Sequence, residues 1–194
     1  MKNSLFLFAL IFFLLLSCST KKVVKDNVVA RSSHEYPYNR SEWAHWSDSD
    51  GNCLDTRGEI LKKRSLISVT LNKKGCKVKS GEWNDYYYPE ILFQAAQVDI
   101  DHLIPLKHAH LVGAARWSSE LKEAFANDPE NLVITNRRYN RQKGAKGIHE
   151  WLPLNKSYAC KYVQDWKKIK KKYALQIGAE ENKTYSLLKA DCGF

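Results

Sequence analysis

The chain contains 194 residues, of which 44% are hydrophobic, and its 31 Lys and Arg against 21 Asp and Glu give a formal net charge of +10. This length suffices for one hydrophobic core and excludes an assembly of several full-sized domains. No internal repeat is visible, which excludes a solenoid. The surplus of positive charge favours partners that carry negative charge.

Residues 1–17 have the pattern of a signal peptide, because Lys2 is followed by an apolar run over 5–16 that is short for a membrane-spanning helix. The segment from Leu15 to Cys18 resembles a bacterial lipobox, whose cysteine is lipidated and becomes the N-terminus. We therefore expect an exported, membrane-anchored lipoprotein, in the outer membrane where one exists, with a secreted or periplasmic protein as the alternative. Residues 18–35 are interpreted as a tether and 36–194 as the functional domain.

Setting Cys18 aside leaves an even number of cysteines in an oxidising compartment, which favours two disulfides. Proximity in sequence favours Cys53 with Cys76 and Cys160 with Cys192. The four cysteines allow three pairings, and the sequence does not choose among them. A four-cysteine zinc site is the alternative, disfavoured because no Cys-x-x-Cys pair is present.

The front of the domain is predicted to hold a helix and a hairpin. Residues 56–63 form a short amphipathic pattern with Thr56 as N-cap and Glu59 three residues later. A strand is expected over 66–71 and another over 77–79, with a turn between them.

The remainder alternates strands and helices and predicts an α+β domain. We expect strands over 97–100 and 132–135 and helices over 109–115, 119–126, 136–143 and 158–173. The strand over 132–135 and the helix after it would form a ββα unit with the strand over 97–100, flanked by the N-terminal hairpin and the outer helices.

Asp101 and His102 close a short apolar strand, and Asn140 lies on the helix that follows the second strand. A carboxylate and an amide oxygen suit Mg²⁺, which takes few protein ligands and keeps several waters. An imidazole with a pKa near 6.5 can accept a proton from water at neutral pH. This pattern predicts a phosphodiesterase site with one divalent cation, held by Asp101 and Asn140, and His102 as the base.

The stretches Asp-Ile-Asp-His-Leu-Ile-Pro-Leu (99–106) and Asn-Arg-Gln-Lys-Gly (140–144) resemble the HNH endonucleases of the ββα-metal, or His-Me finger, superfamily. Cys53–Arg57, Trp117, Phe125–Asp128, Trp151–Pro153 and Cys160-x-Tyr162-x-x-x-Trp166 extend the likeness to a secreted bacterial branch, over residues 40–192. The resemblance implies a finger at about 97–146 and the same roles for His102, Asp101 and Asn140. It also implies that Asn131 holds the loop that carries the base.

Colicin nucleases of this superfamily use additional histidines as ligands, whereas here only His149 is near. This difference favours Mg²⁺, with Mn²⁺ as an alternative, over Zn²⁺. Asp99 is expected either to orient a metal ligand or to be a surface carboxylate.

Basic residues around Asn140 predict phosphate contacts, with Arg141, Lys143 and Lys146 as the candidates and Lys107 nearby. Arg57 is a further candidate, with an ion pair to Asp55 or Glu59 as its alternative role. Trp83 and Tyr86–Tyr88 either stack on bases or belong to the core, and the core is favoured.

These observations predict an endonuclease that prefers DNA to RNA and reads little sequence, because no base-reading motif is present. A noncatalytic nucleic-acid-binding envelope lipoprotein, used for DNA uptake or adhesion, is the first alternative. A structural lipoprotein that binds anionic polymers is the second. No protein partner is predicted.

Overall fold

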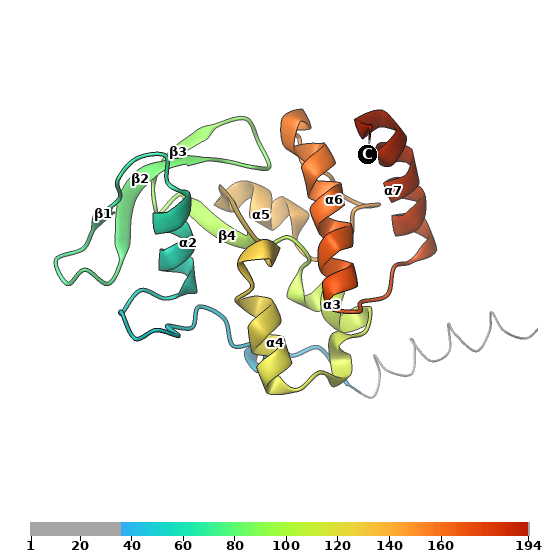
Figure 1. The fold of residues 1–194 in the computed structure, drawn as a ribbon, viewed down its shortest axis with the longest axis horizontal. Coiled ribbons are helices and arrows are strands. Elements are labelled where there is room, and N and C mark those ends of the chain that lie inside the picture. The colour runs from blue at the N-terminus through green and yellow to red at the C-terminus, as the bar shows by residue number, and fades with distance from the viewer. Residues whose placement is uncertain (1–35, 194) are drawn as a thin grey trace, which may run out of the picture.

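The computed structural model describes residues 36–193, which form a three-stranded sheet, a two-stranded sheet and surrounding helices. The expected signal peptide, the tether and Cys18 lie outside the described residues. In Figure 1 the three-stranded sheet occupies one end of the molecule, and helices α6 and α7 occupy the other. The two-stranded sheet and helix α5 lie between them, so the predicted α+β class is confirmed.

The three-stranded sheet is antiparallel in the order β1 (Thr70–Leu71), β2 (Val78–Asn84) and β3 (Ile91–Gln94). Trp83 and Leu92 pair across β2 and β3, and both side chains are buried. The predicted hairpin is present, although β1 has only two residues. Strand β3 was not predicted.

Helix α2 (Thr56–Arg64) packs on this sheet through Ile60 and Leu61, which are buried beside Trp83. Its N-cap is Asp55, whose carboxylate accepts a hydrogen bond from the backbone N–H of Gly58. The prediction of Thr56 as the N-cap is therefore wrong, because the cap lies one residue earlier. The hydroxyl of Thr56 instead donates to the backbone carbonyl of Ser47 and to the side-chain oxygen of Asn127.

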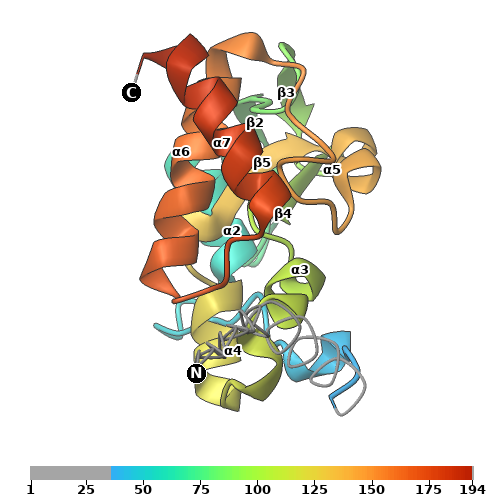
Figure 2. The same cartoon turned by 90° about the vertical axis from the view of Figure 1, so that its right-hand side faces the viewer.

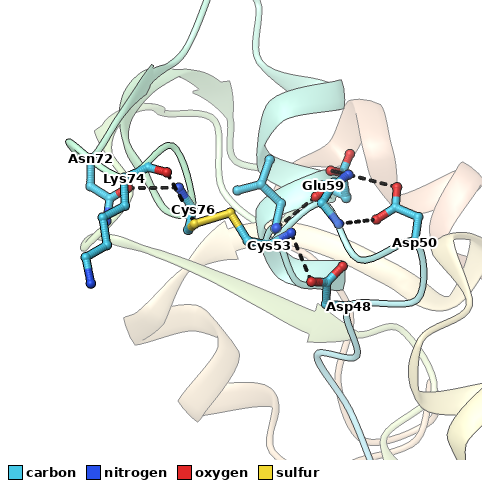
Figure 3. Close-up of a disulfide and its surroundings, with 9 residues drawn as sticks. Asp48, Asp50, Cys53, Glu59, Asn72, Lys74 and Cys76 are labelled. Atoms are coloured by element: carbon cyan, nitrogen blue, oxygen red, sulfur yellow. Dashed lines mark hydrogen bonds between the residues drawn. A yellow bond between two sulfur atoms is a disulfide. The ribbon is translucent and has the colours of Figure 1, made fainter.

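The Cys53–Cys76 disulfide ties the loop before α2 to the turn between β1 and β2 (Figure 3). Asp48 accepts a hydrogen bond from the backbone N–H of Cys53, which lies in the left-handed region with φ of 68°. Asn72 accepts one from the N–H of Cys76. The disulfide thus joins two loops that side chains already hold.

The two-stranded sheet pairs β4 (Val98–His102) with β5 (Leu132–Asn136) in unbroken antiparallel register, from Val98 opposite Asn136 to His102 opposite Leu132. The segment between them contains α3 (Leu106–Leu111), η2 (Ala114–Arg116), α4 (Ser119–Ala126) and η3 (Pro129–Asn131), and α5 (Arg137–Lys143) follows β5. The ββα unit is therefore present. The first strand extends through His102. Helix α3 begins earlier than the predicted helix over 109–115 and overlaps it only up to Leu111.

Helices α6 (Lys156–Lys172) and α7 (Ala179–Cys192) lie side by side, as Figure 2 shows. Helix α6 buries Tyr162, Trp166 and Ile169 against the core, close to the prediction for 158–173. Helix α7 was not predicted. A second disulfide joins Cys160 on α6 to Cys192 on α7.

The two disulfides use the pairing that sequence proximity favours, so the four-cysteine zinc site of the alternative does not form. Over residues 36–193, none of the helices has both the length and the apolar character needed to cross a membrane.

Candidate active site

A cavity of about 370 Å³ opens beside the ββα unit and brings the three principal candidates together. Asp101 and His102 reach it from the end of β4, and Asn140 reaches it from α5. Its lining comprises Tyr38, Arg40, Ile100, Asp101, His102, Pro105, Leu106, Lys107, Asn140, Arg141, Gly144 and Ala145. A carboxylate, an imidazole and an amide therefore share one space with three basic side chains.

Asp101 is only 7% exposed, and its Oδ2 atom is held by two donors. The hydroxyl of Tyr87 donates to Oδ2 at 2.6 Å, and so does the ammonium of Lys143 at 2.6 Å. Neither of these bonds uses Oδ1. The carboxylate is fixed through one oxygen, and the other remains the candidate ligand.

His102 is 5% exposed, and its Nε2 atom lies 2.8 Å from the carbonyl oxygen of Ala126. A carbonyl only accepts, so Nε2 carries the proton and donates, and Nδ1 of the neutral ring is the acceptor. The indole of Trp46 stacks on the ring, with centroids 5.8 Å apart and planes at 22°.

Burial lowers the pKa of His102 to about 3. The bond to Ala126 opposes this shift, whereas the positive charges of Arg40 and Lys143 add to it. The imidazole is therefore neutral throughout the physiological range, which is the state that a general base requires.

Asn140 is oriented by Asp99, because its Nδ2 donates to the Asp99 carboxylate at 3.1 Å. Asp99 also pairs with Arg137, at 3.5 Å between Oδ1 and Nε. Of the two expected roles of Asp99, this contact favours the orienting one. With its NH₂ group engaged, Asn140 keeps its amide oxygen for another partner.

Asn131 is fully buried and supports the segment after β4. Its Oδ1 accepts a hydrogen bond from the backbone N–H of Ile104 at 2.9 Å, and its backbone carbonyl accepts one from the N–H of Leu103. The side chain thus ties η3 to the residues directly after His102, which is the loop contact that the resemblance implied.

Among the four expected phosphate-binding residues, Arg141 lines the cavity, and the other three do not. The expectation for Lys143 is wrong, because its side chain is fully buried and hydrogen-bonded to Asp101 and the His102 carbonyl.

The guanidinium of Arg57 donates hydrogen bonds to the backbone carbonyls of Ala95 and Val98, at 2.9 Å each. Lys146 is exposed and donates to the carbonyl of Gln142.

The core interpretation of the aromatic residues holds for Trp83 and Tyr87, which are 0% and 1% exposed. Tyr86 is half-buried, and the more exposed Tyr88 stacks on Tyr139.

Arg40 is a candidate residue that the sequence did not reveal. It belongs to η1 (Arg40–Glu42), is exposed and lines the cavity beside His102. Arg40 is isolated in the sequence, far from any cluster of basic residues, so nothing in the sequence marked it as a candidate for phosphate binding. Only the fold brings residues near 40 to the end of β4.

The donor chemistry fits a hard divalent cation. Asp101 and Asn140 offer one carboxylate and one amide oxygen, a pair that Mg²⁺ accepts with water and phosphate oxygens as its other ligands. Across the described residues, no three His, Cys, Asp or Glu side chains gather in a way that could hold a metal. The set therefore does not fit a structural or catalytic zinc site of three or four such ligands.

Comparison with known proteins identifies a family that this chain matches. Residues 55–186 match the family described as GmrSD restriction endonucleases, C-terminal domain. The chain is also 33% identical over 157 residues to an uncharacterized secreted protein of Arthroderma benhamiae, an alignment covering 80% of this chain and 76% of that protein. No solved structure matches.

Proposed function

We propose, on the premise that this chain belongs to the family of GmrSD restriction endonuclease C-terminal domains, that it is a metal-dependent endonuclease of the HNH type. The observation that carries the proposal is the neutral His102, whose acceptor nitrogen is Nδ1 and whose ring lines the same cavity as Asp101 and Asn140. A neutral imidazole with an unprotonated nitrogen beside two oxygen ligands is what phosphodiester hydrolysis requires.

In this mechanism Nδ1 of His102 takes a proton from a water molecule, and the water oxygen attacks phosphorus. The bond from phosphorus to the leaving oxygen breaks, and that oxygen takes a proton from solvent. The Ala126 carbonyl keeps the ring in the tautomer that accepts at Nδ1. Arg40, Lys107 and Arg141 would contact the phosphate. A cation held by Asp101 and Asn140, Mg²⁺ before Mn²⁺, would stabilise the negative charge of the leaving group.

The proposed substrate is nucleic acid, with DNA preferred to RNA and little sequence preference. The basic cavity lining and the net charge of +10 support a partner recognised through its phosphates. Purified protein should be tested on linear, circular and single-stranded DNA and on RNA, with and without chelator.

The decisive variant is His102→Ala. We expect it to abolish hydrolysis of plasmid DNA while the circular dichroism spectrum and DNA binding persist, because only the base is lost. Cutting by the variant at the unmodified rate would show that His102 is not the base. If the unmodified protein binds DNA in Mg²⁺ but never cuts it, the noncatalytic alternative is correct.

The disulfides and the secreted relative indicate export. We further propose that Cys18 carries a lipid that anchors the protein to a membrane. Mass spectrometry of the mature N-terminus tests this, and a peptide beginning at any other residue would contradict it.

A further inference from the structure

Lys143 is the least expected component of the candidate site, because an ammonium ion lies fully buried beside a residue proposed to bind a cation. Its Nζ atom is 2.6 Å from Oδ2 of Asp101 and 2.8 Å from the carbonyl oxygen of His102. These contacts join the last turn of α5 to the end of β4. An ammonium ion is retained in the interior only when it is paired and hydrogen-bonded.

Asp101 needs such a partner as well. Its side chain is 8% exposed, and a carboxylate so far removed from water is costly unless a positive charge or several donors stabilise it. Tyr87 supplies one neutral donor to Oδ2, and Lys143 supplies the charge. The positive charge that a divalent cation would bring is therefore already present in the protein.

We infer that Lys143 is a permanent counter-ion of Asp101, a positioning residue that holds the carboxylate in place without metal and weakens the affinity of the site for the divalent cation. The inference rests on the proposed role of Asp101 as a ligand. Lys143 holds the Asp101 carboxylate in place through their ion pair. It weakens the affinity for the divalent cation through Coulomb repulsion between the ammonium and a cation bound to the same carboxylate.

The chain offers a matched control in a second buried pair. Lys170 on α6 lies 2.6 Å from Glu181 on α7, with side chains 0% and 3% exposed. Neither residue lines the cavity that holds Asp101. Breaking this pair also leaves a buried carboxylate without its ammonium, with His108 at 3.2 Å and the indole of Trp166 as its remaining side-chain partners, but it does so away from the proposed cation site.

The test compares the thermal unfolding of the full mature chain and of Lys143→Met, Lys170→Met and Lys143→Met/Asp101→Asn, each in chelator and in excess Mg²⁺. We expect both lysine variants to lose about 10 °C in chelator. Mg²⁺ should restore part of the loss in Lys143→Met and none in Lys170→Met, since ligand binding stabilises only a site that binds it. The double variant, which buries no unpaired charge, should be more stable than Lys143→Met in chelator and indifferent to Mg²⁺.

Binding of Mn²⁺ alone, measured by titration calorimetry, gives a second readout. We expect Lys143→Met to bind Mn²⁺ about tenfold more tightly than the unmodified protein. Equal or weaker binding, or a double variant no more stable than Lys143→Met, would overturn the inference while leaving metal-dependent cleavage by the unmodified protein intact. If the double variant recovers stability but neither the unmodified protein nor any variant binds Mn²⁺, the proposed metal site is rejected together with the weakening of its affinity, and only the pairing of Lys143 with Asp101 stands.

Discussion

The imidazole of His102 owes its protonation state to burial and to the carbonyl of Ala126. The first keeps the ring neutral, and the second decides which nitrogen carries the proton. The sequence could propose a histidine as base, but it could not assign the tautomer, since Ala126 lies 24 residues away on another element.

We predict that His102 makes the protein less stable as the pH falls below about 6.5, its unfolded pKa. The folded pKa is about 3, so between these values the unfolded chain binds one more proton than the folded chain. The free energy of unfolding should therefore decline by up to about 1.4 kcal/mol per pH unit over this window.

Urea titrations of the unmodified protein and of His102→Gln, at several pH values from 7 to about 4, check this. A pH dependence identical in both would show that His102 does not resist protonation in the folded state.

Arg40, which lines the cavity beside His102, gives a second prediction. If its guanidinium contacts the scissile phosphate, Arg40→Ala should lower kcat/KM on DNA by about thirtyfold, corresponding to about 2 kcal/mol for a charge-assisted hydrogen bond. Lys146→Ala is the control, because Lys146 is also exposed and basic but does not line the cavity. Equal losses in both would indicate a general charge effect rather than a contact at the site.

The sequence was sufficient to predict that Asp101, His102 and Asn140 would lie together in one cavity, because their order and the strand and helix that carry them are local features. It misassigned Lys143, because a lysine beside Arg141 on a short helix has the appearance of a surface cation. The direction of the Lys143 side chain toward β4 depends on how α5 packs, and that is a tertiary property.

Local patterns in the sequence predicted the helices that bury an apolar stripe. Helix α6 satisfies this description, with Tyr162, Trp166 and Ile169 on its buried face. Helix α7 does not, since its buried residue is Glu181, which bonds to Lys170 and to the indole of Trp166. A search for apolar periodicity overlooks a helix held by an ion pair and a disulfide.

Asn131 shows how one side chain joins elements, and it yields a prediction. Asn131→Ala leaves the N–H of Ile104 without its acceptor in a fully buried site, so we expect the free energy of unfolding to fall by about 3 kcal/mol. Asn136→Ala, which removes the N-cap of α5 and a part-buried hydrogen bond from the Asn136 amide to Glu90, should cost about 1 kcal/mol. Urea denaturation at pH 7 distinguishes the two variants. An equal loss of unfolding free energy in both would contradict the role of Asn131 in holding the segment after β4.

For the whole molecule, the disulfides join segments that the two sheets do not connect. The Cys160–Cys192 bridge closes a loop across 32 residues and binds α7 to α6. Replacing both cysteines by serine should lower the free energy of unfolding by about 3–4 kcal/mol, mainly by enlarging the unfolded ensemble.

Cleavage of DNA at 25 °C should be retained in this double serine variant, because neither cysteine lines the cavity. Chemical denaturation and a plasmid assay on the same preparation give both answers. Loss of activity at full folding would show that α7 acts on the site.

Cross-links that need an oxidising compartment also have a consequence for the organism that makes this protein. A newly made copy in a reducing cytosol would have free thiols and lack the rigidity that the bridges confer. We expect such a copy to unfold more readily and to be degraded faster than an oxidised copy, so that the protein reaches its full stability only in an oxidising compartment.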